Sequence, residues 1–105
     1  MPRERKNDEL ISKAQEAFDR GSFLEPEDDN ALKWAREAQK AGKPSAMRIE
    51  DQVYSNMMKD LAQLRADHNY DSALMLVNAM VRAFPNHNSL PTVRRAIQRD
   101  KDASE

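Results

Sequence analysis

The chain contains no cysteine among its 105 residues, which excludes disulfide bonds, thiolate nucleophiles and cysteine-ligated metal sites. Only 2 glycines and 6% aromatic residues are present, and β-branched residues are sparse. This composition argues against a sheet, because strands favour Val, Ile, Thr and aromatic side chains. The longest unbroken apolar run, Ala73 to Val77, is far shorter than the ~20 residues that span a bilayer. No transmembrane helix and no membrane insertion are therefore expected.

The charges of the chain nearly cancel, with 17 Lys and Arg against 18 Asp and Glu. Bulk charge therefore gives nucleic-acid binding no support, and no nucleic-acid partner is expected. Residues 1–6 have no apolar stretch behind them, so we expect no signal peptide and a cytoplasmic location. A chain of this length is one small domain at most, with one modest core.

Alanine is frequent and apolar residues recur at helical spacing, so the sequence predicts an all-α protein. We expect a helical domain over residues 7–99, between disordered ends at 1–6 and 100–105. Gly21, Gly42 and Pro85 follow three of the helices as stop signals, and Asp28, Asp29 or Asn30 can each cap the second helix. The five expected helices cover about residues 7–20, 29–41, 45–68, 71–84 and 89–99.

Apolar stripes on these helices predict the buried core. The stripes comprise Leu10, Ala14, Ala17, Phe18, Ala31, Trp34, Ala35, Ala38, Ile49, Val53, Met57, Leu61, Leu64, Ala73, Leu76, Val77, Met80, Val81, Leu90, Val93 and Ile97.

The first four helices fall into two pairs, and the second helix of each pair opens with alanine and ends near a proline. Ala31 and Ala73 hold this position and lie 42 residues apart. The pattern resembles the tetratricopeptide repeat, a helix–turn–helix unit of about 34 residues. The turn over residues 68–73 resembles the family's Gly-Asp-Tyr-Asp-x-Ala turn, with His-Asn in place of Gly-Asp. The longer period and the lack of a large aromatic early in each first helix depart from the family.

A second resemblance lies in the segment from Gly21 to Ala31, which reads Gly-Ser-Phe-Leu-Glu-Pro-Glu-Asp-Asp-Asn-Ala. It looks like the Gly-x-Leu-x-x-Pro-x-x-Asp-Asn-Ala loop of helical-repeat segments in bacterial envelope and signalling proteins, including energy transducers and some kinases.

The tetratricopeptide resemblance implies a short antiparallel helix-pair solenoid, with about two helix–turn–helix units and a C-terminal capping helix. It also implies a non-catalytic protein–protein interaction module that binds a peptide or a partner helix in a groove between helix pairs. The alternative is a helical bundle that mediates homo-oligomerisation, so that a homodimer is a second expected form. The groove residues that the resemblance implies are Ile11, Gln15, Phe18, Met58, Lys59 and Arg65.

No catalytic residue, cofactor or metal ion is expected. Zinc needs three or four ligands, whereas His68 and His87 fall in predicted turns and have no ligand one helical turn away. Residues 25–29 form an acidic loop, for which we expect helix capping and solubility, or else a weak site for a cation or a basic partner.

Two features stay open at the level of sequence. Trp34 lies among alanines, where it either fills the space that they leave or anchors a partner. The basic C-terminal segment, residues 94–101, is either a solvated last turn or a weak contact for an anionic group.

Overall fold

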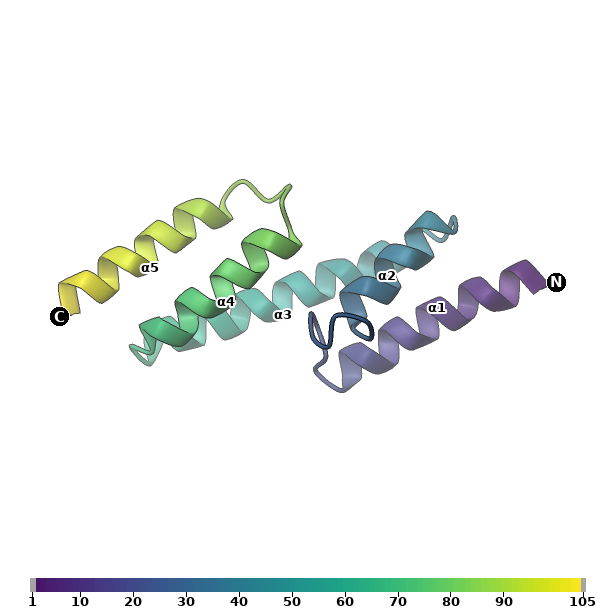
Figure 1. Ribbon diagram of the computed structural model, residues 1–105, viewed down its shortest axis with the longest axis horizontal. Coiled ribbons are helices and arrows are strands. Elements are labelled where there is room, and N and C mark those ends of the chain that lie inside the picture. The colour runs from purple at the N-terminus through teal and green to yellow at the C-terminus, as the bar shows by residue number, and fades with distance from the viewer. Residues whose placement is uncertain (1, 105) are drawn as a thin grey trace. The chain divides into compact units, whose positions relative to one another are not determined.

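The structure is a computed structural model that describes residues 2–104, with side chains described from residue 9 onward. Across the described residues the regular structure is helical and no strand occurs, which confirms the predicted all-α class. None of the helices in this part of the chain is both long and apolar enough to cross a membrane. The helices are α1 (Pro2–Asp19), α2 (Ala31–Lys40), α3 (Ala46–Ala66), α4 (Tyr70–Ala83) and α5 (Leu90–Ser104), as Figure 1 shows.

The two outer helices extend beyond the expected bounds. α1 begins at Pro2, where the fixed φ of proline suits a first helical position. α5 continues through Asp100 and Lys101, and both side chains pair with earlier helices of the chain. The Asp100 carboxylate lies 3.1 Å from the Arg65 guanidinium of α3, and the Lys101 ammonium lies 2.9 Å from the Asp71 carboxylate of α4. Helix extent does not measure disorder, so the expected disorder of the two ends stays a prediction.

The helices α1, α2 and α3 end in the same way. In each, the second residue after the helix has a left-handed backbone conformation. At the end of α1, Gly21 has φ 79°, and at the end of α2, Gly42 has φ 91°. His68 has φ 60° after α3, at the position where the resembled repeat turn carries glycine. In each case the next amide donates back to a carbonyl of the last helical turn, for example Asn69 N–H to Leu64 O at 2.8 Å. These are Schellman ends, and they satisfy carbonyls that the helix leaves unpaired.

The chain divides into two compact units, Met1–Ser55 and Asn56–Glu105, and the division falls within α3. In the first unit α1 and α2 pack side by side and antiparallel, with residues 46–55 of α3 completing the unit. In the second unit α4 packs antiparallel to α5, together with residues 56–66 of α3.

Small side chains build the core of the first unit. Ala14 and Ala17 of α1 are fully buried, as are Ala31, Ala35 and Ala38 of α2. Side chains of this size let the two helix backbones approach closely, as the alanine spacing predicts.

Larger side chains fill the second unit. The set that is fully or almost fully buried comprises Met57, Leu61, Ala73, Val77, Met80, Phe84, Leu90 and Ile97. Positions 31, 35 and 38 of α2 and positions 73, 77 and 80 of α4 are thus all buried, so the second helix of each pair packs through the same spacing.

Parts of the predicted core lie at its edge instead. Seven predicted core residues are only half-buried, because they stand at the margins of their stripes: Leu10, Phe18, Trp34, Leu64, Leu76, Val81 and Val93. Leu32, Ala46 and Phe84 are buried although the stripes did not include them. The solenoid arrangement that the resemblance implies stays a prediction.

Candidate functional site

The loop between α1 and α2 is organised by one buried amide, that of Asn30. Its Nδ2 donates to three carbonyl oxygens of the loop, those of Leu24 at 3.0 Å, Pro26 at 2.8 Å and Glu27 at 3.3 Å. Its Oδ1 accepts a hydrogen bond of 2.7 Å from the Lys33 amide and so caps α2. Of the three caps that the sequence allowed, the structure uses Asn30. The Asn30 side chain thus bonds to the loop through its nitrogen and to α2 through its oxygen. Because Asn30 is fixed in this way, the residue before Asn30 is also fixed in place.

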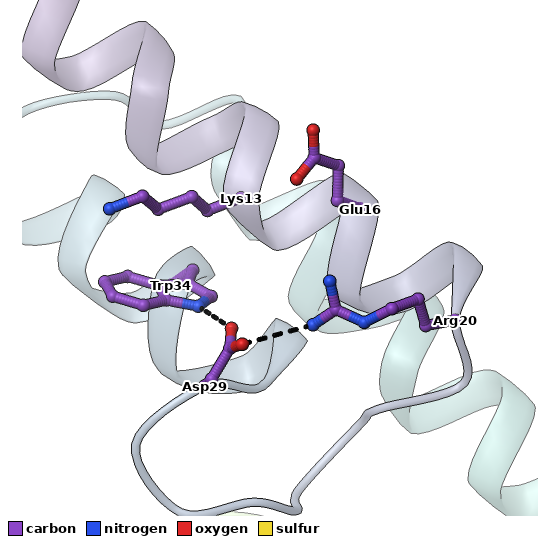
Figure 2. Close-up of a pocket in the computed structure, with 5 residues that line it drawn as sticks. All are labelled: Lys13, Glu16, Arg20, Asp29 and Trp34. Carbon is purple, nitrogen blue, oxygen red and sulfur yellow. Dashed lines mark hydrogen bonds and ion pairs between the residues drawn. The ribbon is translucent and has the colours of Figure 1, made fainter.

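That preceding residue is Asp29, which faces a hollow of about 400 Å³ on the surface of the first unit. Lys13, Glu16 and Arg20 line it from α1, where spacings of three and four residues place them on one face. Trp34, in the first turn of α2, forms the remaining wall (Figure 2). We call this site the Trp34 hollow, and its lining residues are Lys13, Glu16, Arg20, Asp29 and Trp34.

The indole of Trp34 is held from several directions. Its Nε1–H donates to Asp29 Oδ1 at 2.8 Å, and Asp29 Oδ2 lies 3.4 Å from the Arg20 guanidinium. Two ammonium groups lie over the ring, that of Lys13 at 4.6 Å and that of Lys33 at 4.3 Å from the ring centroid. Both distances are within the range of a cation–π interaction. The ring also packs against the buried cluster of α1, α2 and α3, so it is a fixed, half-buried surface.

The electrostatics of the Trp34 hollow favour ionised Asp29. The hydrogen bond from the Trp34 indole is the largest cause, and it lowers the pKa of the Asp29 carboxyl below its ordinary value of 3.8. Partial desolvation opposes this change, while the positive charges of Arg20 and Lys33 add to it. At neutral pH Asp29 is therefore a stable carboxylate, and a weak base of this kind is poorly matched to proton transfer near pH 7.

The arrangement combines an aromatic surface, cations and carboxylates in one open hollow. Such an arrangement offers donors and acceptors for charge-assisted hydrogen bonds beside an apolar ring. Metal binding has no comparable basis here. Among the described side chains, those of residues 9–104, no three His, Cys, Asp or Glu stand close enough together to hold an ion.

The three groove residues predicted on α1 have different surroundings. Ile11 packs against the buried cluster of Ala14, Ala35 and Ile49. The Phe18 ring is half-buried, with its centroid 5.4 Å from that of Phe23 in the loop. Gln15 is exposed, and its amide donates to Asp19 at 3.2 Å. Of these three, Gln15 is the most accessible to a partner.

The three groove residues predicted on α3 lie in the second unit. Met58 is half-buried and Lys59 is exposed. Arg65 is half-buried and already paired with Asp100, so its cation has a carboxylate within the chain. The structure therefore groups the predicted residues as two separate sets, one in each unit, and their joint role in one groove stays a prediction.

The sequence interpretation missed the Trp34 hollow as a site. It weighed Trp34 as core filler or as partner anchor, and the structure gives the ring both a packed and an accessible side. It treated Asp29 only as part of an acidic loop and as one of three candidate caps of the second helix. The available signal was the charged face of α1, since Lys13, Glu16 and Arg20 follow a helical repeat on the side next to the alanine stripe.

Comparison of the chain with protein-family models, with curated proteins and with solved structures gives no match in any of the three. The resemblance to the tetratricopeptide repeat thus rests on the residues and spacings described above.

Proposed function

We propose that the chain is a non-catalytic protein–protein interaction module, and that the Trp34 hollow is a contact point for a segment of the partner. The observation that carries this proposal is the half-buried indole of Trp34, set in an open hollow of about 400 Å³ with charged side chains around it. Aromatic and arginine side chains dominate the binding energy of protein interfaces, and they do so from well-packed positions. The ring has such a position, and Arg20 stands beside it.

The fixed geometry of the site supports the same function. Trp34 is held by a hydrogen bond from its own N–H and by packing on the buried cluster. A partner that docks on it has little side-chain entropy to remove, which favours affinity. The tetratricopeptide resemblance points in the same direction, because that family binds peptides and partner helices.

Homo-oligomerisation is the second candidate, and one observation favours it. Met75 on α4 is 75% exposed, the largest exposure among the large apolar side chains of the described residues. An isolated exposed methionine is common on monomer surfaces, so it supports the second candidate less strongly than the hollow supports the first.

A peptide-display screen combined with light scattering tests the proposal. We expect a monomer at all concentrations, and a set of selected peptides that share a sequence pattern. Peptide binding is then measured with two double variants. Lys13→Ala with Arg20→Ala removes the cations of the hollow, and Gln15→Ala with Lys59→Ala removes the exposed members of the predicted groove.

Loss of binding in the first variant, with the second unchanged, supports the hollow. If the second variant alone loses binding, the partner uses the predicted groove and the hollow is not the contact point. A concentration-dependent dimer that Met75→Ser dissociates, together with no selected peptide, would establish the oligomerisation bundle instead.

A further inference from the structure

We infer that the Trp34 hollow recognises a carboxylate of its partner, with the Lys13 ammonium as the principal contact and Arg20 as the second. This inference rests on the proposed function and extends it, because it specifies that the partner segment carries a negative charge. A peptide meets this description through an acidic side chain or through its free C-terminus.

The first argument is the crowding of positive charge at Trp34. The ammonium groups of Lys13 and Lys33 lie 4.6 Å and 4.3 Å from the same ring centroid, so they repel each other. Lys33 also donates to the Asp28 carbonyl at 2.9 Å, which anchors it to the loop. Lys13 has no carboxylate partner among the described residues, and the ring holds it at the edge of the hollow. An anion beside Lys13 offsets the repulsion without moving the lysine.

The second argument is the state of Arg20 and Asp29. Both Asp29 oxygens already accept from groups of the chain, one from the Trp34 indole and one from Arg20, so part of the Asp29 charge is offset within the hollow. Arg20 uses one terminal nitrogen for Asp29, and a guanidinium carries five N–H donors. Its side chain is 51% exposed, which leaves the other donors accessible. Of the groups that lower the pKa of Asp29, Arg20 and Lys33 also act through their charge on a second carboxylate nearby, whereas the Trp34 N–H is already used by Asp29.

Two carboxylates oppose an anion in this hollow: that of Asp29, which is paired with Trp34 and Arg20, and that of Glu16. Glu16 lines the hollow, and its carboxylate has no hydrogen bond or ion pair among the described residues. In Figure 2 it is turned away from the Trp34 ring, on the side of Arg20. Removing the Glu16 charge tests the sign of the ligand's charge, because this change strengthens the binding of an anion and weakens the binding of a cation.

The experiment titrates the full chain with short synthetic peptides on one apolar framework. One peptide carries glutamate, one glutamine and one lysine, and each has blocked ends; a fourth has glutamine with a free C-terminus. Trp34 is the only tryptophan of the chain, so its emission and its indole N–H resonance report on this site alone. The glutamate peptide is expected to bind more tightly than the glutamine peptide, and the lysine peptide least tightly. Tight binding of the fourth peptide identifies the C-terminal carboxylate as the source.

The variants are Lys13→Ala and Glu16→Gln. Both positions are exposed, so these substitutions are expected to leave the fold intact. For the glutamate peptide we expect Lys13→Ala to weaken binding about two- to fivefold and Glu16→Gln to tighten it by a similar factor, as exposed charge pairs contribute. Lys40→Ala and Glu37→Gln make the same changes on α2, away from the lining of the hollow, and they are expected to leave affinity unchanged. Both effects are expected to shrink as salt increases.

The outcomes separate this inference from the proposed function. If the lysine peptide binds best and Glu16→Gln weakens it, the hollow is a cation site; the interaction module stands and the carboxylate inference is wrong. Equal affinity of all four peptides also refutes the inference. If no peptide from the screen or from this series perturbs Trp34, the proposed contact point itself is wrong.

Discussion

Replacing Asn30 gives the sharpest test of how the first unit is held together. This side chain is only 5% exposed, and it joins the loop to α2 through an acceptor on one side and a donor on the other. Asn30→Ala removes both functions. Asn30→Asp keeps the acceptor that caps α2 but places a second oxygen against the three loop carbonyls.

The structure lets the cost of Asn30→Ala be worked out in parts. Loss of the cap costs about 0.5–2 kcal/mol in comparable helices. The amide has two hydrogens, so two of its three loop contacts count as full hydrogen bonds, each of about 0.5–1.5 kcal/mol. Together these contributions predict a loss of about 1.5–5 kcal/mol from the free energy of unfolding of the first unit.

The comparison with Asn30→Asp separates the two roles. Aspartate caps helices about as well as asparagine, so a pure capping role predicts a change of no more than about 0.5 kcal/mol. The loop contacts predict instead a loss of about 2 kcal/mol or more, because a buried oxygen would face carbonyls that have lost their donor. Asn69 provides a matched control. It precedes α4 without any side-chain cap hydrogen bond, so Asn69→Ala is expected to change stability by less than about 0.5 kcal/mol.

Urea unfolding followed by Trp34 emission measures these differences, since the tryptophan lies in the same unit as Asn30. Circular dichroism on the same samples confirms that each variant is helical before denaturant is added. An Asn30→Asp variant as stable as the parent would refute the reasoning, because the three carbonyls would then not depend on the amide.

Three further predictions concern other parts of the chain. Ala73 is fully buried in α4, so Ala73→Trp is expected to cost about 1–3 kcal/mol or more by overpacking; thermal melting within a degree or two of the parent, as for a surface change, contradicts this. His68 adopts a left-handed φ of 60°, so His68→Gly is expected to be more stable than His68→Ala by about 1 kcal/mol, the reverse of their order inside a helix; equal stabilities by urea unfolding would disprove the strain. The pKa of Asp29 is lowered below 3.8, so its contribution to stability is present above that pH and is lost as the pH falls through the lowered pKa. The indole N–H resonance of Trp34 is expected to shift with a midpoint below pH 3.8, and a midpoint above it, or the same shift in Asp29→Asn, would show that another group is responsible.

Helix positions were largely predictable because they depend on local signals. Gly21 and Gly42 end their helices through left-handed dihedrals, as glycine at these places predicts. The alanines of α2 are buried at the spacing that the sequence shows. The end of α5 was not predictable in this way: the helix continues past the expected bound, where Asp100 and Lys101 form ion pairs with Arg65 and Asp71, which are distant in sequence.

The candidate site was less predictable, because its members come from three different segments of the chain. Lys13 and Trp34 meet only after the loop has folded, and sequence periodicity treats each helix separately. The apolar stripe of α1 led to Ile11 and Phe18 as groove residues, whereas both rest on other apolar groups of the first unit. The charged residues next to that stripe follow a helical repeat, but this repeat did not identify a site until the position of Trp34 was known.

The loop motif joins stability and binding in the first unit. Asn30 is buried to hold the loop, and Ala31, the next residue, is buried where α2 begins. The residue before Asn30 is therefore forced outward at a fixed point, and there Asp29 accepts the indole N–H of Trp34. A change at Asn30 that leaves the helices intact is therefore also expected to weaken the hydrogen bond between Asp29 and the ring. The same three residues, Asp-Asn-Ala, set the helix start, the helix packing and one wall of the Trp34 hollow.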